Sequence, residues 1–212
     1  MTQPTPHASH AAPGSLQPLT LDAHDLAQRL ALASSSDTCK GMFFNGLFVA
    51  VQRKGGEAVD RLKQARSQKF VDFFNYPIAE FLPLAFLAAE LVAQGATPAK
   101  LAEGIRSLGR QATDDFLGTA VGKTLLMLSG SDPRRLMNSL SSGYKTAVSY
   151  GVRSVTWTGA SSCVFSMRRD FMPHPYHEGV LEQVVSAVGG RDAKVTGRRL
   201  DVLDTDYEVS WR

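Results

Sequence analysis

Residues 150–168 read YGVRSVTWTGASSCVFSMR, and this stretch decides the fold of the chain. Two segments within it, 150–157 and 162–168, alternate with a period of two, as half-buried strands do. The side chains that share one face are Arg153, Val155 and Trp157 in the first segment, and Cys163, Phe165 and Met167 in the second. Gly159 and Ala160 lie between the two segments and suit a tight turn. The stretch therefore predicts an antiparallel β-hairpin.

A helix and a second hairpin follow. Pro175 fits the first turn of a helix and Gly189-Gly190 fits its end. The apolar stripe between them consists of Val180, Leu181, Val184, Val185 and Val188. Residues 194–199 predict a weak strand, and residues 206–211 predict a final strand in which Tyr207, Val209 and Trp211 face the core. The order is β-β-α-β-β, and we expect Trp211 to be substantially buried.

The first two thirds of the chain are predicted to be helical. Apolar residues at spacings of three and four, together with capping residues and prolines, indicate helices over 21–33, 41–51, 57–69, 77–94, 98–116 and 133–140. Gly104 and Gly109 weaken their helix and predict that another helix crosses it closely. The fold class is therefore α+β, with a helical layer packed on a four-stranded antiparallel sheet.

Length and composition limit the kinds of protein this can be. With 212 residues, of which 43% are hydrophobic, the chain suits one domain with a sizeable core. Residues 1–19 are rich in Pro, Ser, Thr, His and Ala, so we expect a disordered tail before a single domain at 20–212. The net charge of +3 is too small to indicate binding to nucleic acid.

The cysteines and the apolar segments indicate which cellular compartment to expect for this protein. The two cysteines, Cys39 and Cys163, form neither a disulfide framework nor a zinc set, which favours a reducing, cytoplasmic setting. The N-terminus lacks the pattern of a secretory signal. The longest apolar stretch, 81–93, is shorter than the roughly 20 residues that a membrane-spanning helix needs.

Three local patterns suggest chemistry, and each has a plainer structural interpretation. Residues 118–124 read GTAVGKT, but a phosphate-binding loop needs four residues between its glycines and follows a strand. His174 and His177 are three residues apart and are weak candidates for a metal site, although a third ligand is not evident. Cys163 shares a strand face with Phe165 and Met167, so a buried inert thiol is its ordinary role. No catalytic constellation is predicted.

The aromatic residues are the remaining clue. They concentrate in two predicted helices and the segment that links them. Core packing accounts for most of them, and an apolar pocket between helices and sheet is the functional alternative. The candidate pocket residues are Phe44, Phe48, Phe74, Tyr76, Phe81, Trp157, Cys163 and Phe165.

Several spaced segments, taken in order, resemble a known family. They are GMFFNGL at 41–47, YPIAEFL at 76–82, LGR at 108–110, YHEGVL at 176–181 and DYEVSW at 206–211. The series is similar to an uncharacterised paralogous family expanded in myxobacteria, and the resemblance covers residues 20–212. That family resembles a larger group of 4-vinyl-reductase-type sensing domains, TRAPP vesicle-tethering subunits and heme nitric-oxide-binding domains. The resemblance implies the same α+β fold, but it does not imply one function. Because some TRAPP subunits carry an acyl chain on a buried cysteine, the resemblance makes Cys163 a candidate for acylation, although no motif here maps that role onto it.

The chain departs from these relatives where their cofactors bind. It has no cysteine after Cys163, so the zinc cluster of the sensing domains is missing, and it lacks the Tyr-x-Ser-x-Arg signature of the heme domains. No histidine occurs between His24 and His174 to serve as the proximal heme ligand. We therefore expect no cofactor.

The sequence favours a non-enzymatic regulatory or sensory module that binds a small hydrophobic ligand, a partner protein or both. One alternative is a ligand-free dimeric scaffold like the TRAPP subunits. The other is a metal- or heme-dependent sensor or enzyme that uses His174 or His177. The expected partners are a small apolar ligand and either a second copy of the chain or another protein.

Overall fold

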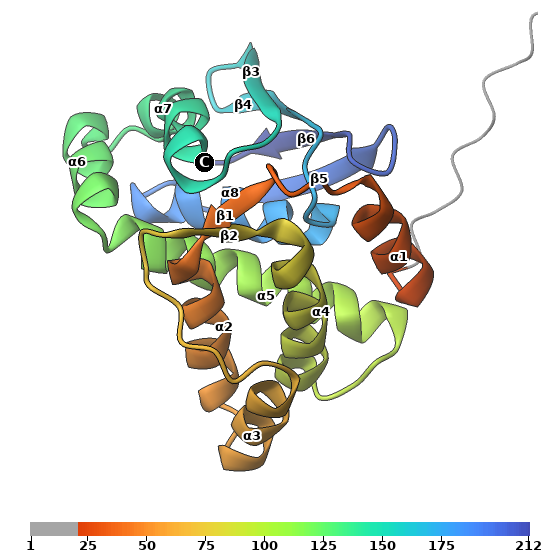
Figure 1. Cartoon of the computed structure of the whole chain (residues 1–212). Coiled ribbons are helices and arrows are strands. Elements are labelled where there is room, and N and C mark those ends of the chain that lie inside the picture. Colours follow the sequence, from red (N-terminus) through yellow and green to blue (C-terminus); the bar gives the residue numbers. More distant parts are fainter. Residues whose placement is uncertain (1–20) are drawn as a thin grey trace, which may run out of the picture.

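A computed structural model describes residues 21–212 of the chain (Figure 1). The expected disordered tail at 1–19 lies outside these residues. The helices are α1 (Ala23–Leu32), α2 (Gly41–Gln52), α3 (Gly56–Ala65), α4 (Ile78–Ala93), α5 (Pro98–Leu117), α6 (Ala120–Ser129), α7 (Pro133–Ala147) and α8 (His174–Ala187). The strands are β1 (Thr38–Lys40), β2 (Asn75–Pro77), β3 (Val152–Gly159), β4 (Ser162–Arg168), β5 (Lys194–Arg199) and β6 (Thr205–Ser210).

The predicted C-terminal sheet is confirmed. Its four strands are antiparallel in the order β3-β4-β6-β5, and α8 connects β4 to β5. Cys163 pairs with Trp157 on one side and Val209 on the other, and Val209 pairs in turn with Val195. This register aligns the apolar side chains of all four strands on one face. The opposite face carries residues such as Ser154, Thr156 and Glu208, which are exposed.

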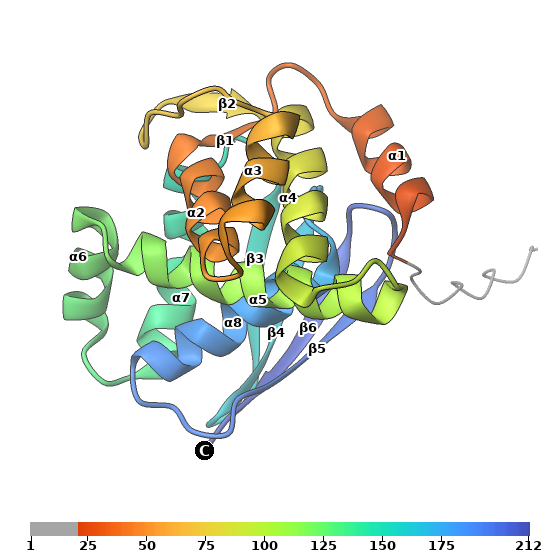
Figure 2. The same cartoon turned by 90° about the horizontal axis from the view of Figure 1, so that it is seen from below.

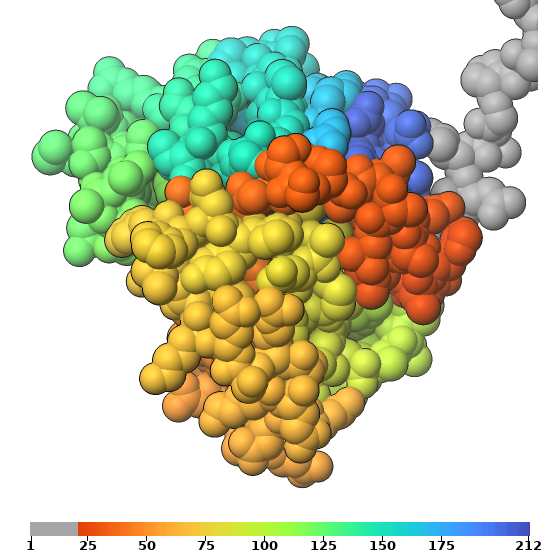
Figure 3. All heavy atoms as spheres, viewed as in Figure 1, coloured from red at the N-terminus to blue at the C-terminus, as the bar shows by residue number. Residues whose placement is uncertain are grey.

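The helices cover the apolar face of the sheet in successive layers. Figure 2 shows α8 next to the strands, α5 beyond α8, and then α2, α3 and α4. Figure 3 shows that α3 forms the tip of the molecule farthest from the sheet and that α6 forms a projecting corner. No single described helix is both long and apolar enough to cross a membrane, and α4 and α5 meet that test only as a pair bent by 105°.

Glycines permit the closest helix contacts, as predicted for α5. A Cβ at Gly109 would lie 1.9 Å from the carbonyl oxygen of Tyr176 in α8, and a Cβ at Gly104 would lie 2.2 Å from that of Ala89 in α4. The contact between α5 and α8 is reciprocal, because a Cβ at Gly179 would lie 2.0 Å from the carbonyl oxygen of Arg106. Two helix backbones therefore touch where side chains would normally separate them.

Several sequence predictions require correction. β1 and β2 form a two-stranded sheet that the sequence did not indicate, because three-residue strands are too short to show a period. α6 is a separate helix, and α7 continues seven residues beyond the predicted Leu140 to Ala147. Trp211 lies beyond the end of β6 and is only partly buried, where its ring meets that of Trp157 at 6.1 Å between centroids.

Candidate ligand cavity

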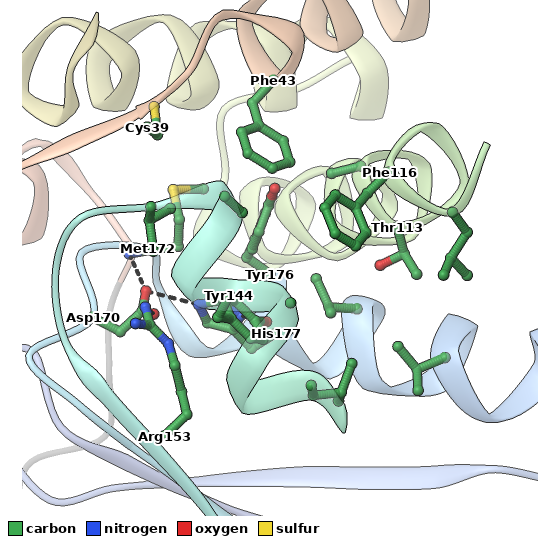
Figure 4. Close-up of a pocket in the computed structure, with 18 of the residues that line it drawn as sticks. Cys39, Phe43, Thr113, Phe116, Tyr144, Arg153, Asp170, Met172, Tyr176 and His177 are labelled. Atoms are coloured by element: carbon green, nitrogen blue, oxygen red, sulfur yellow. Dashed lines mark hydrogen bonds and ion pairs between the residues drawn. The ribbon is translucent and has the colours of Figure 1, made fainter. Parts of the chain in front are cut away.

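A cavity of about 90 Å³ lies where α5, α7 and α8 meet the segment around β1 (Figure 4). Its apolar wall is supplied by side chains from all of these elements. The wall includes Cys39, Phe43, Phe81, Ala112, Phe116, Leu117, Leu125, Leu136, Leu140, Gly143, Ala147, Val148, Met172, Val180 and Val184. The remaining lining residues are Thr113, Tyr144, Tyr150, Arg153, Asp170, Tyr176 and His177.

α7 forms one side of the cavity because of its sequence period. Leu136 and Leu140, Leu140 and Tyr144, and Gly143 and Ala147 are each four residues apart, so all five residues lie along one helix face. Asp132 caps the helix through the backbone N–H of Arg134, and Pro133 occupies its first turn. The small residues Gly143 and Ala147 leave space where larger side chains would fill the cavity.

Polar side chains meet at one end of the cavity. His177 on α8 is 2.8 Å from Asp170 through Nε2 and 2.9 Å from the Tyr144 hydroxyl through Nδ1. An ionised Asp170 can only accept hydrogen bonds, so Nε2 carries the proton and donates it. Nδ1 is the ring nitrogen that faces the Tyr144 hydroxyl. Both ring nitrogens are therefore engaged within the protein.

Arg153 completes this polar group from the strand β3. Its guanidinium donates to Asp170 and to the backbone carbonyl of Tyr150, and it lies over the Tyr144 ring at 4.6 Å from the centroid. The side chain of Arg153 is 4% exposed and that of Asp170 is 5% exposed. Figure 4 shows Arg153 rising from its strand toward Asp170, with His177 and Tyr144 beside them. Arg153 and Asp170 thus form a buried ion pair at the cavity wall.

Burial and charge set the protonation states at this end of the cavity. Burial raises the pKa of Asp170, but the attraction of His177 and Arg153 outweighs burial and holds the pKa far below its ordinary value. Burial, with a smaller contribution from the charge of Asp170, raises the pKa of Tyr144 far above its ordinary value. The carboxylate is therefore charged and the phenol is neutral at physiological pH.

The structure places the predicted pocket residues in three separate regions. Among them only Phe81 lines the cavity. The ring of Phe44 packs on Phe70 and Tyr76 with centroid distances of 4.1 and 5.6 Å, so these aromatics fill space instead of enclosing it. Phe48 lies at the edge of this core and Phe74 is 65% exposed.

The remaining predicted pocket residues belong to the face of the sheet beneath α8. Cys163 and Phe165 are buried in β4, and Trp157 in β3 is partly buried. Burial raises the pKa of Cys163 to about 11, so the thiol is neutral and poorly suited to nucleophilic chemistry. None of the three lines the cavity.

His174 and His177 do not converge on a shared site. Nδ1 of His174 is 3.2 Å from Glu178 on the same helix, whereas His177 contacts Asp170 and Tyr144. Among residues 21–212, no group of three or more His, Cys, Asp or Glu side chains is arranged to hold a metal ion.

The segment 118–124 serves the start of α6. The Thr119 side chain accepts a hydrogen bond from the backbone N–H of Gly122 and so caps the helix. A Cβ at Gly122 would lie 2.2 Å from the carbonyl oxygen of Phe116. Gly122 is therefore required by the close contact between α6 and the end of α5, not by a phosphate.

The polar residues Tyr144, Arg153 and Asp170 were not singled out from the sequence. The faint signal for Arg153 was a charged residue on the same face of its strand as Val155 and Trp157. An arginine on a buried face needs a partner. The sequence could not identify Asp170 as that partner, because the two residues lie on opposite sides of a hairpin.

The sequence of this chain matches a known protein family. The family described as "Protein of unknown function (DUF2378)" matches residues 32–212. The chain belongs to this DUF2378 family. Among curated proteins, none matches this DUF2378 chain.

Solved structures with a similar fold are H-NOX proteins. The DUF2378 chain is similar to the Fe(II) unliganded H-NOX protein from K. algicida, with a TM-score of 0.64, 14% identity and coverage of 82% of this chain and 96% of that one. It is also similar to an H-NOX protein from S. oneidensis in the Fe(II)NO ligation state, with a TM-score of 0.61, 13% identity and coverage of 82% and 99%. An oxygen-binding H-NOX domain related to soluble guanylate cyclases matches with a TM-score of 0.58, 12% identity and coverage of 82% and 95%.

At these identities the likeness establishes the fold. It confirms the expected α+β class and the resemblance to heme nitric-oxide-binding domains as a structural one. The further resemblance to TRAPP subunits and the myxobacterial origin stay predictions.

The residues of the DUF2378 cavity, as they are arranged, do not fit a heme. Its volume of about 90 Å³ is well below the roughly 300–1,000 Å³ of ligand and cofactor sites. Heme iron is usually held by His, Cys, Met or Tyr. Both ring nitrogens of His177 are already hydrogen-bonded within the protein. Burial raises the pKa of the Cys39 thiol and of the Tyr144 phenol far above their ordinary values, which disfavours the thiolate and the phenolate that would bind iron.

Proposed function

We propose that this protein is a non-enzymatic sensory module whose signal is the occupancy of the cavity by a small, mostly apolar molecule. The observation that carries the proposal is the cavity itself, which is lined mainly by apolar side chains of the helical layer, with Arg153 as the contribution of the four-stranded sheet. Large apolar cavities are costly to maintain in a protein core, because the lining atoms lose packing partners. A ligand of matching size restores those contacts.

The size of the cavity limits the ligand. Apolar cavities of about 150 Å³ in other proteins bind benzene or xenon. A volume of about 90 Å³ therefore favours a molecule no larger than a single ring or a short branched chain. The polar side chains at the wall are mostly paired with one another, so they do not form a free acid and base for catalysis.

The contacts of α7 provide a route by which occupancy reaches the surface. α7 supplies five of the lining residues and is joined to the edge strand β3 by polar contacts. Ser141 donates to the carbonyl of Arg153 at 3.0 Å, and Asn138 accepts from the Trp157 indole at 3.1 Å. Arg134 donates to the carbonyl of Gly159 at 2.9 Å and stacks over Trp157. A ligand that moves α7 would therefore change the position or order of β3.

A heme sensor is the second candidate function. It is supported by the fold shared with H-NOX proteins, whose structures are described as Fe(II) unliganded, as an Fe(II)NO ligation state and as an oxygen complex. The small cavity and the engaged His177 oppose it. Heme binding would require α7 to move away from α8 and the Tyr144–His177 hydrogen bond to break.

Native mass spectrometry of the full chain, purified without a histidine tag, tests the proposal. We expect a non-covalent adduct of low mass that is released on denaturation, and no visible absorbance of a porphyrin. The control is Gly143→Leu, which fills the cavity, compared with Gly56→Leu, where a Cβ meets no atom within 4 Å. The adduct should disappear in the first variant and persist in the second.

The other outcomes decide between the alternatives. A stoichiometric porphyrin spectrum, lost in a His177 or Tyr144 variant, would replace the proposal with the heme sensor. An empty cavity in a chain that is dimeric, with no adduct after incubation with small hydrocarbons, would favour the ligand-free scaffold.

A further inference from the structure

The buried guanidinium of Arg153 has one hydrogen-bond donor left over. Its two terminal nitrogens donate to Asp170 and to the carbonyl of Tyr150. Its Nε is buried and has no hydrogen-bond partner among the residues that the structure describes. Within residues 21–212 the one other buried side-chain atom in this state is the Ser129 hydroxyl on α6, which is not part of the cavity.

The neighbouring polar groups do not satisfy this donor. Asp170 already accepts from Arg153, from His177 and from the backbone N–H of Met172. The nearest π surface is the Tyr144 ring, which is a weaker acceptor than an oxygen atom. A buried donor without an acceptor is unfavourable. Arg153 is one of the residues that line the cavity, so a molecule in the cavity that reaches Nε would supply the missing acceptor.

The charges near Arg153 indicate that this molecule is neutral. Asp170 already balances the positive charge of Arg153, and both ring nitrogens of His177 are engaged by Asp170 and Tyr144. An anionic ligand would therefore add an uncompensated charge to a wall that is otherwise apolar. A second donor on the ligand would have few acceptors available there.

We infer that the ligand is a small neutral molecule with an apolar body and one oxygen acceptor, such as a ketone, an aldehyde or an ether, and that Arg153 Nε donates to this oxygen. The inference rests on the proposed function, since it specifies the ligand class for the same cavity. The ligand would lie with its oxygen toward β3 and its hydrocarbon part between α5, α7 and α8.

Two probes of nearly the same shape test the inference in the unmodified chain. Cyclohexanone carries a carbonyl where methylenecyclohexane carries a CH₂ group. Transfer of a carbonyl out of water is unfavourable, so an apolar cavity without a donor would bind the hydrocarbon far more tightly. We expect titration calorimetry to give cyclohexanone a dissociation constant equal to or below that of methylenecyclohexane.

Arg153→Lys supplies the second arm, because lysine keeps the charge and removes Nε. The control is Arg110→Lys, a half-exposed arginine that pairs with Glu182 and does not line the cavity. In Arg153→Lys, cyclohexanone should bind at least 10-fold more weakly, whereas methylenecyclohexane should change less than two-fold. Both constants should be unchanged in Arg110→Lys.

The failure of this inference differs from the failure of the proposed function. If methylenecyclohexane binds and cyclohexanone binds far more weakly, or if both probes respond equally to Arg153→Lys, the cavity binds ligand but Arg153 does not recognise an acceptor. If neither probe binds the unmodified chain, the proposed function itself is overturned. Should Arg153→Lys fail to fold, the comparison of the two probes in the unmodified chain still decides whether the cavity recognises an oxygen acceptor.

Discussion

Asp37 ties the start of β1 to the loop that follows β4. Its carboxylate accepts hydrogen bonds from the Arg169 guanidinium and from both the backbone N–H and the hydroxyl of Ser34, the last two at 2.8 and 2.7 Å. The bond from Arg169 is the largest influence, and together with Ser34 it outweighs burial and lowers the pKa of Asp37 to about 2. A single residue thus joins the helical part to the sheet.

This pKa gives a prediction about acid stability. An unfolded aspartate titrates near pH 3.9, so the native carboxylate stabilises the fold above that pH and loses its contribution as the pH falls to about 2. Asp37→Asn should therefore lower the free energy of unfolding at pH 7 by about 1.5–3 kcal/mol. The difference from the unmodified chain, measured by denaturant unfolding, should shrink between pH 4 and pH 2.

The matched control is Asp60→Asn, an exposed carboxylate whose nearest partner is Lys63 at 4.0 Å. It should change the unfolding free energy little at any pH. A difference for Asp37→Asn that stays constant from pH 7 to pH 2 would contradict this account of Asp37.

The crossing of α5 and α8 is the contact on which the helical layer depends. Substituting Gly109 or Gly179 with alanine places a methyl group against backbone carbonyl oxygen at 1.9 or 2.0 Å, so the helices must separate. Each substitution should cost about 2 kcal/mol or more in thermal or denaturant unfolding, although alanine favours the helical state. Gly56→Ala is the control, because a Cβ there meets no atom within 4 Å, and it should be neutral or slightly stabilising. Equal stability of all three variants would show that the crossing is loose.

The same elements show what a sequence can predict. The alternation in β3 and β4 and the apolar stripe of α8 reflect local periods, and the structure confirms all three. The glycines of α5 correctly indicated a close crossing, but not which helix crosses. β1 and β2 were missed because their pairing, such as Cys39 with Tyr76, joins segments that are far apart in the chain.

Trp211 shows that alternation in the sequence predicts burial poorly at the end of a strand. The alternation of Tyr207, Val209 and Trp211 is real, and the first two are buried. The strand ends at Ser210, however, so the last side chain leaves the register of the sheet. Its ring packs on the edge of Trp157 instead of beneath α8. A period of two predicts a face only as far as the strand continues.

At the scale of the whole molecule, the sequence could suggest a pocket but could not locate it. Its aromatic residues were the visible signal, yet Phe44, Phe70 and Tyr76 pack against each other and leave no space. The cavity lies instead where small residues such as Ala112 and Gly143 form part of the wall. A cavity depends on what several distant elements leave unfilled, and no local pattern records that.

The polar end of the cavity has the same origin. His177 drew attention in the sequence as a metal candidate, but its partners Asp170 and Tyr144 come from other elements. The arrangement of β3, α7 and α8 brings them together. The chain shares its fold with H-NOX proteins, but the chemistry at this junction depends on the residues of this chain.

Thermal unfolding with and without methylenecyclohexane tests the central claim most directly, in the unmodified chain, in Gly143→Leu and in Gly56→Leu. A ligand at 100 times its dissociation constant stabilises the native state by about 2.7 kcal/mol. The account predicts that the midpoint rises by about 5–10 °C in the unmodified chain and in Gly56→Leu. It predicts no rise in Gly143→Leu, because leucine occupies the space between Leu125 and Phe116. No rise in the unmodified chain, or an equal rise in Gly143→Leu, would contradict the claim that this cavity is the binding site.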